Sequence, residues 1–286
     1  MADVLAHKQG RPVANGAPRK PSSLKTTKAV VLAGGKGTRL APYTSVLPKP
    51  LMPVGDRAIL EVVVAQLEDA GIVDINLCVG YLSHLIQAVF DNRENGHVNI
   101  TYVREHEALG TAAPLRLVED LDETFLVMNG DVLTGLDYRD LVNYHHAQGN
   151  LLTIATHDRT IKVDYGILHL DVRQQLRDFE EKPELSTPVS MGIYVMEPEV
   201  LEYIPSGKYF DFPDLVKALL QASVRVGAYR YDGLWFDIGR QEDYEHAVAS
   251  WDANGNGNGN EHRRAAANRN GSKAAKARSR TRGGRA

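Results

Sequence analysis

Cysteine is almost absent from this 286-residue chain, which contains only Cys78. A lone cysteine excludes an internal disulfide, and its place in an apolar run predicts a small buried side chain in a strand. No apolar run approaches the roughly 20 residues that cross a bilayer. The first 28 residues also lack the apolar core of a secretory signal. These absences argue against a membrane-spanning or disulfide-stapled secreted protein and predict a cytoplasmic one.

Charge is distributed unevenly although the formal net charge is only −3. Residues 1–28 carry +5 and residues 253–286 carry +8, which leaves −16 for the body. Both ends are poor in large apolar residues, and "NGNGNGN" opens the tail, as is typical of flexible, solvated segments. A basic tail could also touch nucleic acid or an anionic surface. We expect disordered basic extensions over 1–27 and 253–286, and the function in 28–252.

Strand-like and helical patterns alternate from Ala29 to about residue 150. The apolar runs "AVVLA", "INLCVG", "VNITYV" and "TFLVMNGD" predict strands. Helical patterns follow them, including one from about Thr111 to Glu119 and one in "DYRDLVNYHHAQG", where His145 and His146 are expected to form a surface pair. Strands separated by helices of 10–15 residues predict an α/β fold with a doubly wound, mostly parallel sheet.

The pattern changes after Leu151. Shorter strands are expected in "LLTIATH", "YGILHLD", "VSMGIYVM" and "VRVGAYRY", with fewer helices between them. This change predicts an α+β second half, over 151–252, that completes the same sheet.

A glycine segment, "GGKG" (residues 34–37), follows directly after the first predicted strand. Ligands of open α/β sheets bind beyond the carboxyl ends of the strands, where glycines let backbone N–H groups approach an anion. The dinucleotide fingerprint would need glycine at Leu40. The P-loop would need Lys after its second glycine, whereas Lys36 precedes Gly37. Neither phosphate loop fits, and the four residues alone are equally compatible with a turn carrying solvated cations.

Two cations after the glycines favour a phosphate site. Arg39 follows closely, and Lys49 stands between Pro48 and Pro50. Proline fixes φ, so Lys49 is expected to be held in position. A fixed Lys and Arg above a glycine loop suit a triphosphate whose charge must be neutralised during transfer.

The whole stretch "LAGGKGTRLAPYTSVLPKPLMPVGDRAILE" resembles the signature of the sugar-1-phosphate nucleotidylyltransferases, or NDP-sugar pyrophosphorylases. The resemblance covers about Lys28 to Trp251. It implies a Rossmann-like fold with a nucleotide-binding half over 28–150 and a sugar-phosphate-binding half over 151–252. It further implies in-line attack of a sugar-1-phosphate oxygen on the α-phosphorus of an NTP, with release of pyrophosphate. The nucleotide-contacting residues that it implies here are Leu32, Ala33, Gly34, Gly35, Gly37, Thr38, Arg39 and Lys49, with Arg39 and Lys49 catalytic.

Two aspartates follow apolar segments in separate halves of the body. "VMNGDV" places Asp131 after Gly130 at a strand end, and "LWFDIG" places Asp237 after a bulky triplet. Each alone is equally explained as a turn or helix-capping residue. Mg²⁺ is held by one or two carboxylates plus substrate oxygens. The resemblance implies that Asp131 and Asp237 hold Mg²⁺, and that Gly130 lies beside the nucleotide.

The acceptor side is indicated by "FEEKPE", which contains Glu181 and Lys182. A Glu-Lys pair is usually a solvated surface pair. The resemblance instead implies that Lys182 binds the sugar phosphate, as a catalytic group, and that Glu181 accepts from sugar hydroxyls. It also places Gly166 of "DYGIL" and Gly192 of "SMGIYV" near the sugar; each glycine could equally mark a bulge.

Base selection is expected in "REHEALGTAAPL". Guanine offers adjacent N1–H and N2–H₂ donors, from which a carboxylate such as Glu107 can accept both hydrogen bonds. The segment also resembles its counterpart in the mannose-1-phosphate guanylyltransferases, which implies that Leu109, Gly110 and Thr111 contact the nucleotide. GTP is therefore favoured, although a solvated loop glutamate stays an alternative, as do UTP and dTTP.

The sugar and the partners are less defined. Many mannose-1-phosphate guanylyltransferases continue into a C-terminal β-helix, where this chain has its basic tail, so heptose, glucose or a specialised sugar stays open beside mannose. We expect NTP and sugar 1-phosphate as partners, no membrane and no nucleic acid, with a homo-oligomer left open. A non-catalytic nucleotide-sugar sensor is the alternative from another functional class.

Overall fold

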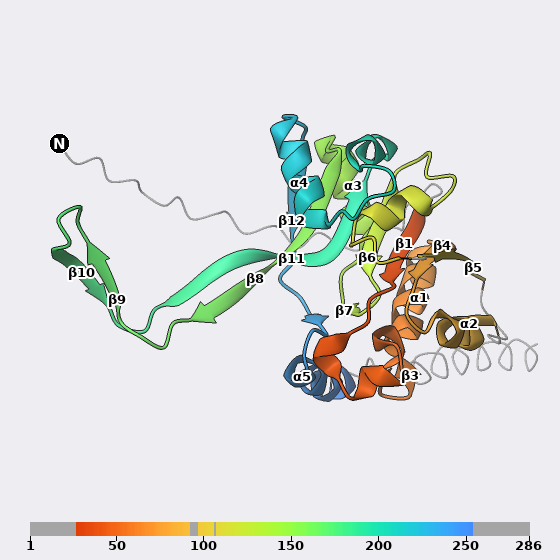
Figure 1. Cartoon of the computed structure of the whole chain (residues 1–286), viewed down its shortest axis with the longest axis horizontal. Coiled ribbons are helices and arrows are strands. Elements are labelled where there is room, and N and C mark those ends of the chain that lie inside the picture. Colours follow the sequence, from red (N-terminus) through yellow and green to blue (C-terminus); the bar gives the residue numbers. More distant parts are fainter. Residues whose placement is uncertain (1–26, 92–96, 106, 254–286) are drawn as a thin grey trace, which may run out of the picture.

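A computed structural model describes residues 27–91, 97–105 and 107–253 (Figure 1). The expected disordered extensions therefore lie outside the described residues, apart from Thr27 and Ala253. Across the described residues, no helix combines the length and apolarity needed to cross a membrane.

A seven-stranded sheet in the order β12-β8-β11-β6-β1-β4-β5 forms the centre of the body. Within this described sheet, β11 (Glu184–Met196) runs antiparallel to its neighbours, and the remaining strands run in one direction. The mostly parallel sheet predicted from the sequence is confirmed. The other strands are β1 (Lys28–Ala33), β4 (Asp74–Val79), β5 (Asn99–Arg104), β6 (Phe125–Asn129), β8 (Leu152–Lys162) and β12 (Val226–Arg230).

Helices cover both faces of this sheet, as a doubly wound fold requires. On one face of the sheet, the helices are α1 (Ile59–Ala70), α2 (Ser83–Asp91) and α3 (Tyr138–Gln148). They pack against the side chains of β1 and β4 that point to that face. On the other, α4 (Phe212–Gln221) and the 3₁₀ segments η4 (Ala113–Leu117) and η5 (Pro198–Tyr203) pack on the alternate side chains. Cys78 belongs to this second layer, and burial raises the pKa of its thiol to about 12.

A third, smaller cluster holds the glycine-proline segment. This segment folds as three 3₁₀ turns, η1 (Thr38–Leu40), η2 (Tyr43–Ser45) and η3 (Lys49–Leu51), followed by the short strands β2 (Pro53–Val54) and β3 (Arg57–Ala58). Leu40, Met52 and Val54 pack there with Trp251 of α5 (Gln241–Ala253). The loop after β1 is therefore anchored by the last helix described.

Two details of the first half differ from the sequence prediction. The helix expected from about Thr111 to Glu119 is only the 3₁₀ segment η4, because the chain becomes extended again at Val118. His145 is fully buried, not on the surface. It lies on the face of α3 that meets the sheet, where its ring nitrogens are 2.8 Å from the Thr153 hydroxyl and 3.0 Å from the Glu197 carboxylate.

The second half contains the longest strands, so the prediction of shorter strands there is wrong. β8 and β11 pair as a ribbon that extends out of the body and continues into the hairpin of β9 (Ile167–Leu170) and β10 (Leu176–Glu180) (Figure 1). We call residues 157–190 the arm. The α+β half does complete the central sheet, through β8, β11 and β12.

Candidate active site

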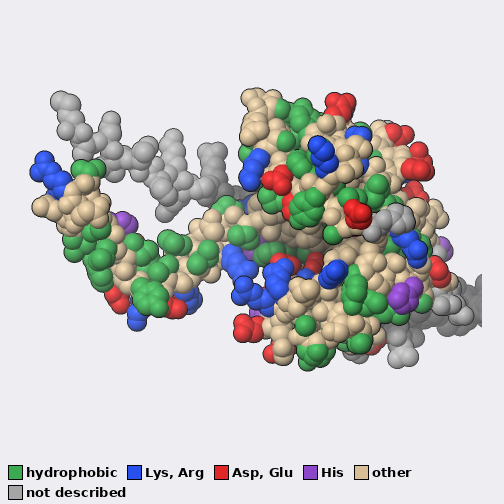
Figure 2. Space-filling view, viewed as in Figure 1, with side chains coloured by type: hydrophobic (Ala, Val, Ile, Leu, Met, Phe, Trp, Pro, Cys, Tyr) green, Lys and Arg blue, Asp and Glu red, His purple; other side chains and the backbone are tan. Residues whose placement is uncertain are grey.

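A cavity of about 890 Å³ opens where the parallel strands end. β1 lies between β4 and β6, so the chain reverses its direction of winding at this strand, and such a switch point forms a crevice at the carboxyl edge. The space-filling view shows a hollow here with acidic and basic side chains around it (Figure 2). The cavity is lined by Leu32, Ala33, Gly34, Gly35, Lys36, Gly37, Arg39, Lys49, Pro50, Gly80, Tyr81, Glu105, Glu107, Ala108, Gly110, Thr111, Asn129, Asp131, Tyr209 and Asp211.

Two glycines of the loop after β1 stand where a side chain would meet close neighbours. A Cβ on Gly34 would lie 2.5 Å from the Glu105 carboxylate, so a side chain would displace it. Gly37 has a φ of +61° and would meet Lys49 and Thr44 at 3.0 Å. The Gly37 carbonyl accepts a hydrogen bond from the Thr44 hydroxyl at 2.9 Å, which ties the glycine loop to the proline segment. The backbone of the glycine loop is therefore packed closely against the neighbouring segments that line the cavity.

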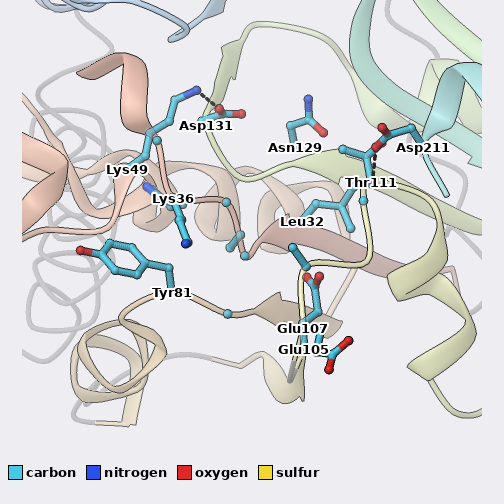
Figure 3. Close-up of a pocket in the computed structure, with 18 of the residues that line it drawn as sticks. Leu32, Lys36, Lys49, Tyr81, Glu105, Glu107, Thr111, Asn129, Asp131 and Asp211 are labelled. Atoms are coloured by element: carbon cyan, nitrogen blue, oxygen red, sulfur yellow. Dashed lines mark hydrogen bonds and ion pairs between the residues drawn. The ribbon is translucent and has the colours of Figure 1, made fainter. Parts of the chain in front are cut away.

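Lys49 and Asp131 form an ion pair across the cavity mouth (Figure 3). Pro48 is extended, and Lys49 begins η3 with Pro50 after it, so the prolines fix the backbone that carries the ammonium. Both side chains are mostly shielded, with exposed fractions of 12% and 19%. The proline-held cation therefore lies beside the carboxylate that follows β6.

Asp237 stands next to this pair. It ends β13 (Trp235–Asp237), which pairs antiparallel with β7 (Val132–Thr134) and sets Asp237 opposite Val132. Partial burial raises the pKa of Asp237, and the nearby Asp131 carboxylate raises it further, while Lys49 and Arg39 lower it. The Asp237 side chain is exposed, and it is not among the residues that line the cavity. The structure thus brings the two predicted carboxylates together from separate halves.

This donor set fits a magnesium ion. No group of three or more His, Cys, Asp or Glu side chains with metal-binding geometry occurs within the described ranges. Two carboxylates suit Mg²⁺, which completes its shell with water and phosphate oxygens. A cation at this place would relieve the repulsion by which Asp131 helps to raise the pKa of Asp237.

The opposite wall is the segment after β5. Leu109 receives a hydrogen bond at its carbonyl from the Phe210 N–H at 2.8 Å. Thr111 donates through both its N–H, at 2.9 Å, and its hydroxyl, at 3.0 Å, to the Asp211 carboxylate (Figure 3). Gly110 has a φ of +89°, and a Cβ there would lie 2.7 Å from the Phe210 carbonyl oxygen. The segment is therefore clamped to the loop that precedes α4.

Several lining residues escaped the sequence analysis. Glu105 is a half-buried carboxylate whose pKa is raised by burial and lowered by a hydrogen bond from the Leu109 N–H. Asp211 accepts from the Tyr209 hydroxyl at 2.6 Å as well as from Thr111. Glu105 belongs to the segment "REHEALGTAAPL" but was not among its predicted contacts, whereas Asp211 lies outside every quoted motif, 100 positions from Thr111. Lys36, Tyr81 and Asn129 are also lining residues.

Other predicted nucleotide-side residues take supporting positions. Thr38 begins η1. Gly130 connects β6 to β7, and its N–H donates to the Leu32 carbonyl at 2.9 Å. A Cβ on Gly130 would lie 3.1 Å from that carbonyl oxygen. Close strand packing thus explains the glycine without a ligand.

The structure does not bring three of the predicted sugar-side residues to the cavity. Gly166, Glu181 and Lys182 lie on the arm, between the ribbon and the hairpin, and do not line the cavity. Gly192 differs, because it lies in β11 within the body at a φ of +73°. A Cβ on Gly192 would be 2.6 Å from the amide of Asn129, which does line the cavity.

Residues 28–253 match the family described as Nucleotidyl transferase. The chain belongs to the nucleotidyl transferase family. Over 241 residues it is 34% identical to UTP–glucose-1-phosphate uridylyltransferase of Synechocystis, which spans 77% of this chain. Over 230 residues it is 32% identical to mannose-1-phosphate guanyltransferase of Saccharomyces cerevisiae, which spans 76% of it. The match covers 62% of the length of each of these relatives.

Solved structures of this family have the same fold. A Bacillus anthracis protein described as a glucose-1-phosphate thymidylyltransferase, in complex with sucrose, aligns with a TM-score of 0.62 at 27% identity, over 78% of this chain and 94% of that one. HddC from Yersinia pseudotuberculosis, complexed with GMP-PN, aligns with a TM-score of 0.59 at 26% identity, over 79% of this chain and all of that one.

Proposed function

We propose that this protein is a sugar-1-phosphate nucleotidylyltransferase that joins GTP to mannose 1-phosphate or a related sugar phosphate. The observation that carries the proposal is the Lys49–Asp131 pair, set beside Asp237 and opposite a glycine loop at the switch point of the sheet. This arrangement offers both the cations and the carboxylates that triphosphate chemistry requires. It also lies where open α/β sheets bind their ligands.

The triphosphate would lie between the glycine loop and the three cations Lys36, Arg39 and Lys49. An oxygen of the sugar phosphate attacks the α-phosphorus, the bond from that phosphorus to the bridging β-oxygen breaks, and pyrophosphate leaves with the electron pair. No group on the protein needs to form a covalent bond. Fixed cations then act by holding the phosphates in line and neutralising charge that develops on them.

Asp131 and Asp237 would hold Mg²⁺ in this site. When bound, the ion would neutralise phosphate charge and fix the triphosphate. In its absence Lys49 neutralises Asp131, so nucleotide and metal binding would release the Lys49 ammonium toward the phosphates. Lys49 would therefore pair with Asp131 in the free protein and with a phosphate group once the nucleotide and metal are bound.

GTP is favoured as the nucleotide because two carboxylates, Glu105 and Glu107, line the wall where a base would lie. A carboxylate can accept both adjacent donors of guanine, whereas uracil and thymine offer one N–H between two carbonyls. Mannose-1-phosphate guanyltransferase among the relatives, and the GMP-PN complex among the structures, support this preference. The uridylyl- and thymidylyltransferase relatives supply the alternative nucleotides and make glucose 1-phosphate the alternative sugar.

The test is pyrophosphate release by the full chain with Mg²⁺, across GTP, UTP, dTTP, CTP and ATP, each with mannose 1-phosphate and with glucose 1-phosphate. We expect release with GTP and mannose 1-phosphate above all other pairs. Glu107→Gln should narrow the difference between GTP and UTP, because an amide cannot accept twice. An unchanged preference would remove Glu107 from the account. If the protein binds a nucleotide but releases no pyrophosphate with any substrate pair, the alternative of a non-catalytic nucleotide-sugar sensor would be favoured.

A further inference from the structure

The arm exposes apolar side chains that a folded protein normally covers. In its hairpin, Leu168 pairs across the strands with Phe179, and Leu170 pairs with Leu176, so these four residues share one face. All four are about half exposed. The other face carries His169, opposite Asp178. Hydrophobic side chains cover much of the arm surface in Figure 2.

The ribbon also exposes apolar side chains. Ile161 and Leu185 are cross-strand partners and are 49% and 48% exposed. Tyr165, between ribbon and hairpin, is 80% exposed. An apolar surface of this extent is a docking surface in most proteins.

The arm is held away from its own body. The ribbon pairs without interruption from Ser190–Thr156 to Glu184–Lys162, which carries the chain roughly 20 Å outward at about 3.3 Å per residue. Its base is braced by β12 and the residue after it: Arg230 binds Asp158 at 2.5 Å, and the Tyr231 N–H donates to the Thr156 carbonyl at 2.8 Å.

The only break in the β8–β11 register that the structure describes cannot serve as a free hinge. It falls between Ser190 and Tyr194, where β11 has extra residues. Met191 and Ile193 of this bulge are buried, and the Met191 carbonyl accepts from the Trp235 indole N–H at 3.1 Å. Folding the arm back onto its own cavity would disrupt this part of the core.

The junction of ribbon and hairpin carries the predicted sugar-side residues. Lys182 has a φ of +45°, which is strained for a non-glycine residue and directs the chain sharply before Pro183. A Cβ on Gly166 would lie 2.5 Å from the Phe179 ring and 3.3 Å from the Glu181 carboxylate. Glu181, Gly166 and the apolar face are therefore built as one unit, remote from the cavity of the same chain.

We propose that a second copy of this chain is the partner of the arm, and that reciprocal exchange of arms brings Glu181 and Lys182 of each copy to the cavity of the other. The proposal rests on the proposed function for the roles of these two residues. Exchange about a two-fold axis uses the same surface twice and closes the assembly. A specific interface needs about 20–30 residues a side, and the arm, residues 157–190, is of that size.

The decisive experiment combines two nearly inactive variants. Lys49→Ala disables the cavity and leaves the arm intact, whereas Lys182→Ala disables the arm and leaves the cavity intact. Co-expressed with different affinity tags and purified through both, the mixed dimer contains one site built from an intact cavity and an intact arm. We expect it to recover about half of the wild-type turnover, since one of its two sites is complete. Each variant purified alone should show about 1% of the wild-type turnover or less.

Recovery no greater than either variant alone would overturn arm exchange, and would show that each chain completes its own site. A wild-type chain without turnover on any substrate pair would instead count against the proposed function. In that case cross-linking still tests whether the arms are exchanged, because it does not depend on turnover. Cysteines introduced as Lys36→Cys and Lys182→Cys, treated with a short bismaleimide, should join two chains; a link within one chain, or none, would contradict the proposal.

The apolar face has its own matched pair of variants. Leu168→Lys puts a charge on the apolar face, and His169→Lys puts the same charge on the opposite face, beside Asp178. Analytical ultracentrifugation should show two-chain particles for the wild type and for His169→Lys, and a shift to single chains for Leu168→Lys. A single-chain wild type at assay concentration, or equal behaviour of both variants, would contradict docking through this face.

Discussion

Lys49 compensates the charge of two carboxylates, Asp131 in the cavity and Asp237 beside it. It neutralises Asp131 directly and lowers the pKa of the neighbouring Asp237. Because the pair is mostly shielded from water, the remaining charge would be poorly compensated if one partner were removed. Under the proposed function, the same ammonium would contact a phosphate when a metal ion is bound by the two carboxylates.

We expect Lys49→Ala to lower kcat by about 10²–10³, as removal of one fixed charge-stabilising donor does in other enzymes. Steady-state pyrophosphate release measures this effect, and circular dichroism checks the fold. Lys217→Ala is the control, because Lys217 is 71% exposed on α4 and contacts only the surface Asp214 among the ion pairs described. Near-native turnover of Lys49→Ala would remove Lys49 from the catalytic account.

Asp237→Asn should separate metal binding from stability. Burial and Asp131 raise the pKa of Asp237, so the folded protein disfavours its charged form, and a neutral amide should slightly increase the unfolding free energy of the metal-free protein at neutral pH. The same change should raise the Mg²⁺ concentration needed for turnover. Thermal unfolding with and without Mg²⁺ measures both effects, with Asp122→Asn, in the exposed loop before β6, as control. Lower metal-free stability together with unchanged Mg²⁺ dependence would contradict this reasoning.

At the scale of single elements, the segment after β5 shows how a loop becomes a rigid wall. The Phe210 backbone and the Asp211 carboxylate fix it at Leu109 and Thr111, and Gly110 fits only because it has no side chain. This wall is where the base is proposed to lie. Small changes here should therefore affect nucleotide affinity as well as stability.

Gly110→Ala and Gly71→Ala form a matched comparison. Both glycines have a φ near +90°, and both alanines should lose about 1–2 kcal/mol through the left-handed backbone. A Cβ on Gly71 meets nothing within 4 Å, whereas one on Gly110 meets the Phe210 carbonyl oxygen at 2.7 Å. Gly110→Ala should therefore lose about 1 kcal/mol or more in addition, by overpacking, and raise KM for the nucleotide. If urea unfolding shows equal losses of unfolding free energy for the two variants, the contact with the Phe210 carbonyl oxygen does not contribute to the loss at Gly110.

The sequence predicted those parts of the site that local order determines. The glycine loop and Asp131 follow the ends of β1 and β6. The ends of parallel strands meet at one edge of a sheet, so the proximity of these two parts follows from the alternation of strands and helices. Asp211 was missed because its place depends on which loops meet across the cavity. Glu105 was missed because nothing in its segment shows that it lines the cavity together with Glu107. The direction of the arm was missed as well, since alternating apolar residues predict a strand but not whether its outer face is covered.

At the scale of the whole molecule, His145 links the first half to the second. From α3 it contacts Thr153 of β8 and Glu197 at the start of η5. Burial lowers the pKa of His145 below its ordinary value of 6.5, although the Glu197 carboxylate opposes the shift. The unfolded chain thus binds a proton that the folded protein rejects, so this contribution to stability is present above about pH 6.5 and is lost as the pH falls.

Urea unfolding between pH 8 and pH 5.5 tests this contribution. The wild-type unfolding free energy should decline toward low pH, and His145→Gln should show a smaller decline, although its overall stability is lower. His84→Gln, at an exposed position of α2, should keep the wild-type decline. An identical decline in all three proteins would assign the pH dependence to other groups.

The central claim, transfer of a nucleotidyl group to a sugar phosphate, is tested most directly by the products. Mass spectrometry of a reaction containing the wild-type chain, Mg²⁺, GTP and mannose 1-phosphate should find GDP-mannose, and a parallel assay should find pyrophosphate in equal amount. The same stoichiometry with another pairing would keep the reaction and change the substrates. Nucleoside diphosphate and inorganic phosphate without any nucleotide sugar, or no product from any pairing, would contradict the claim.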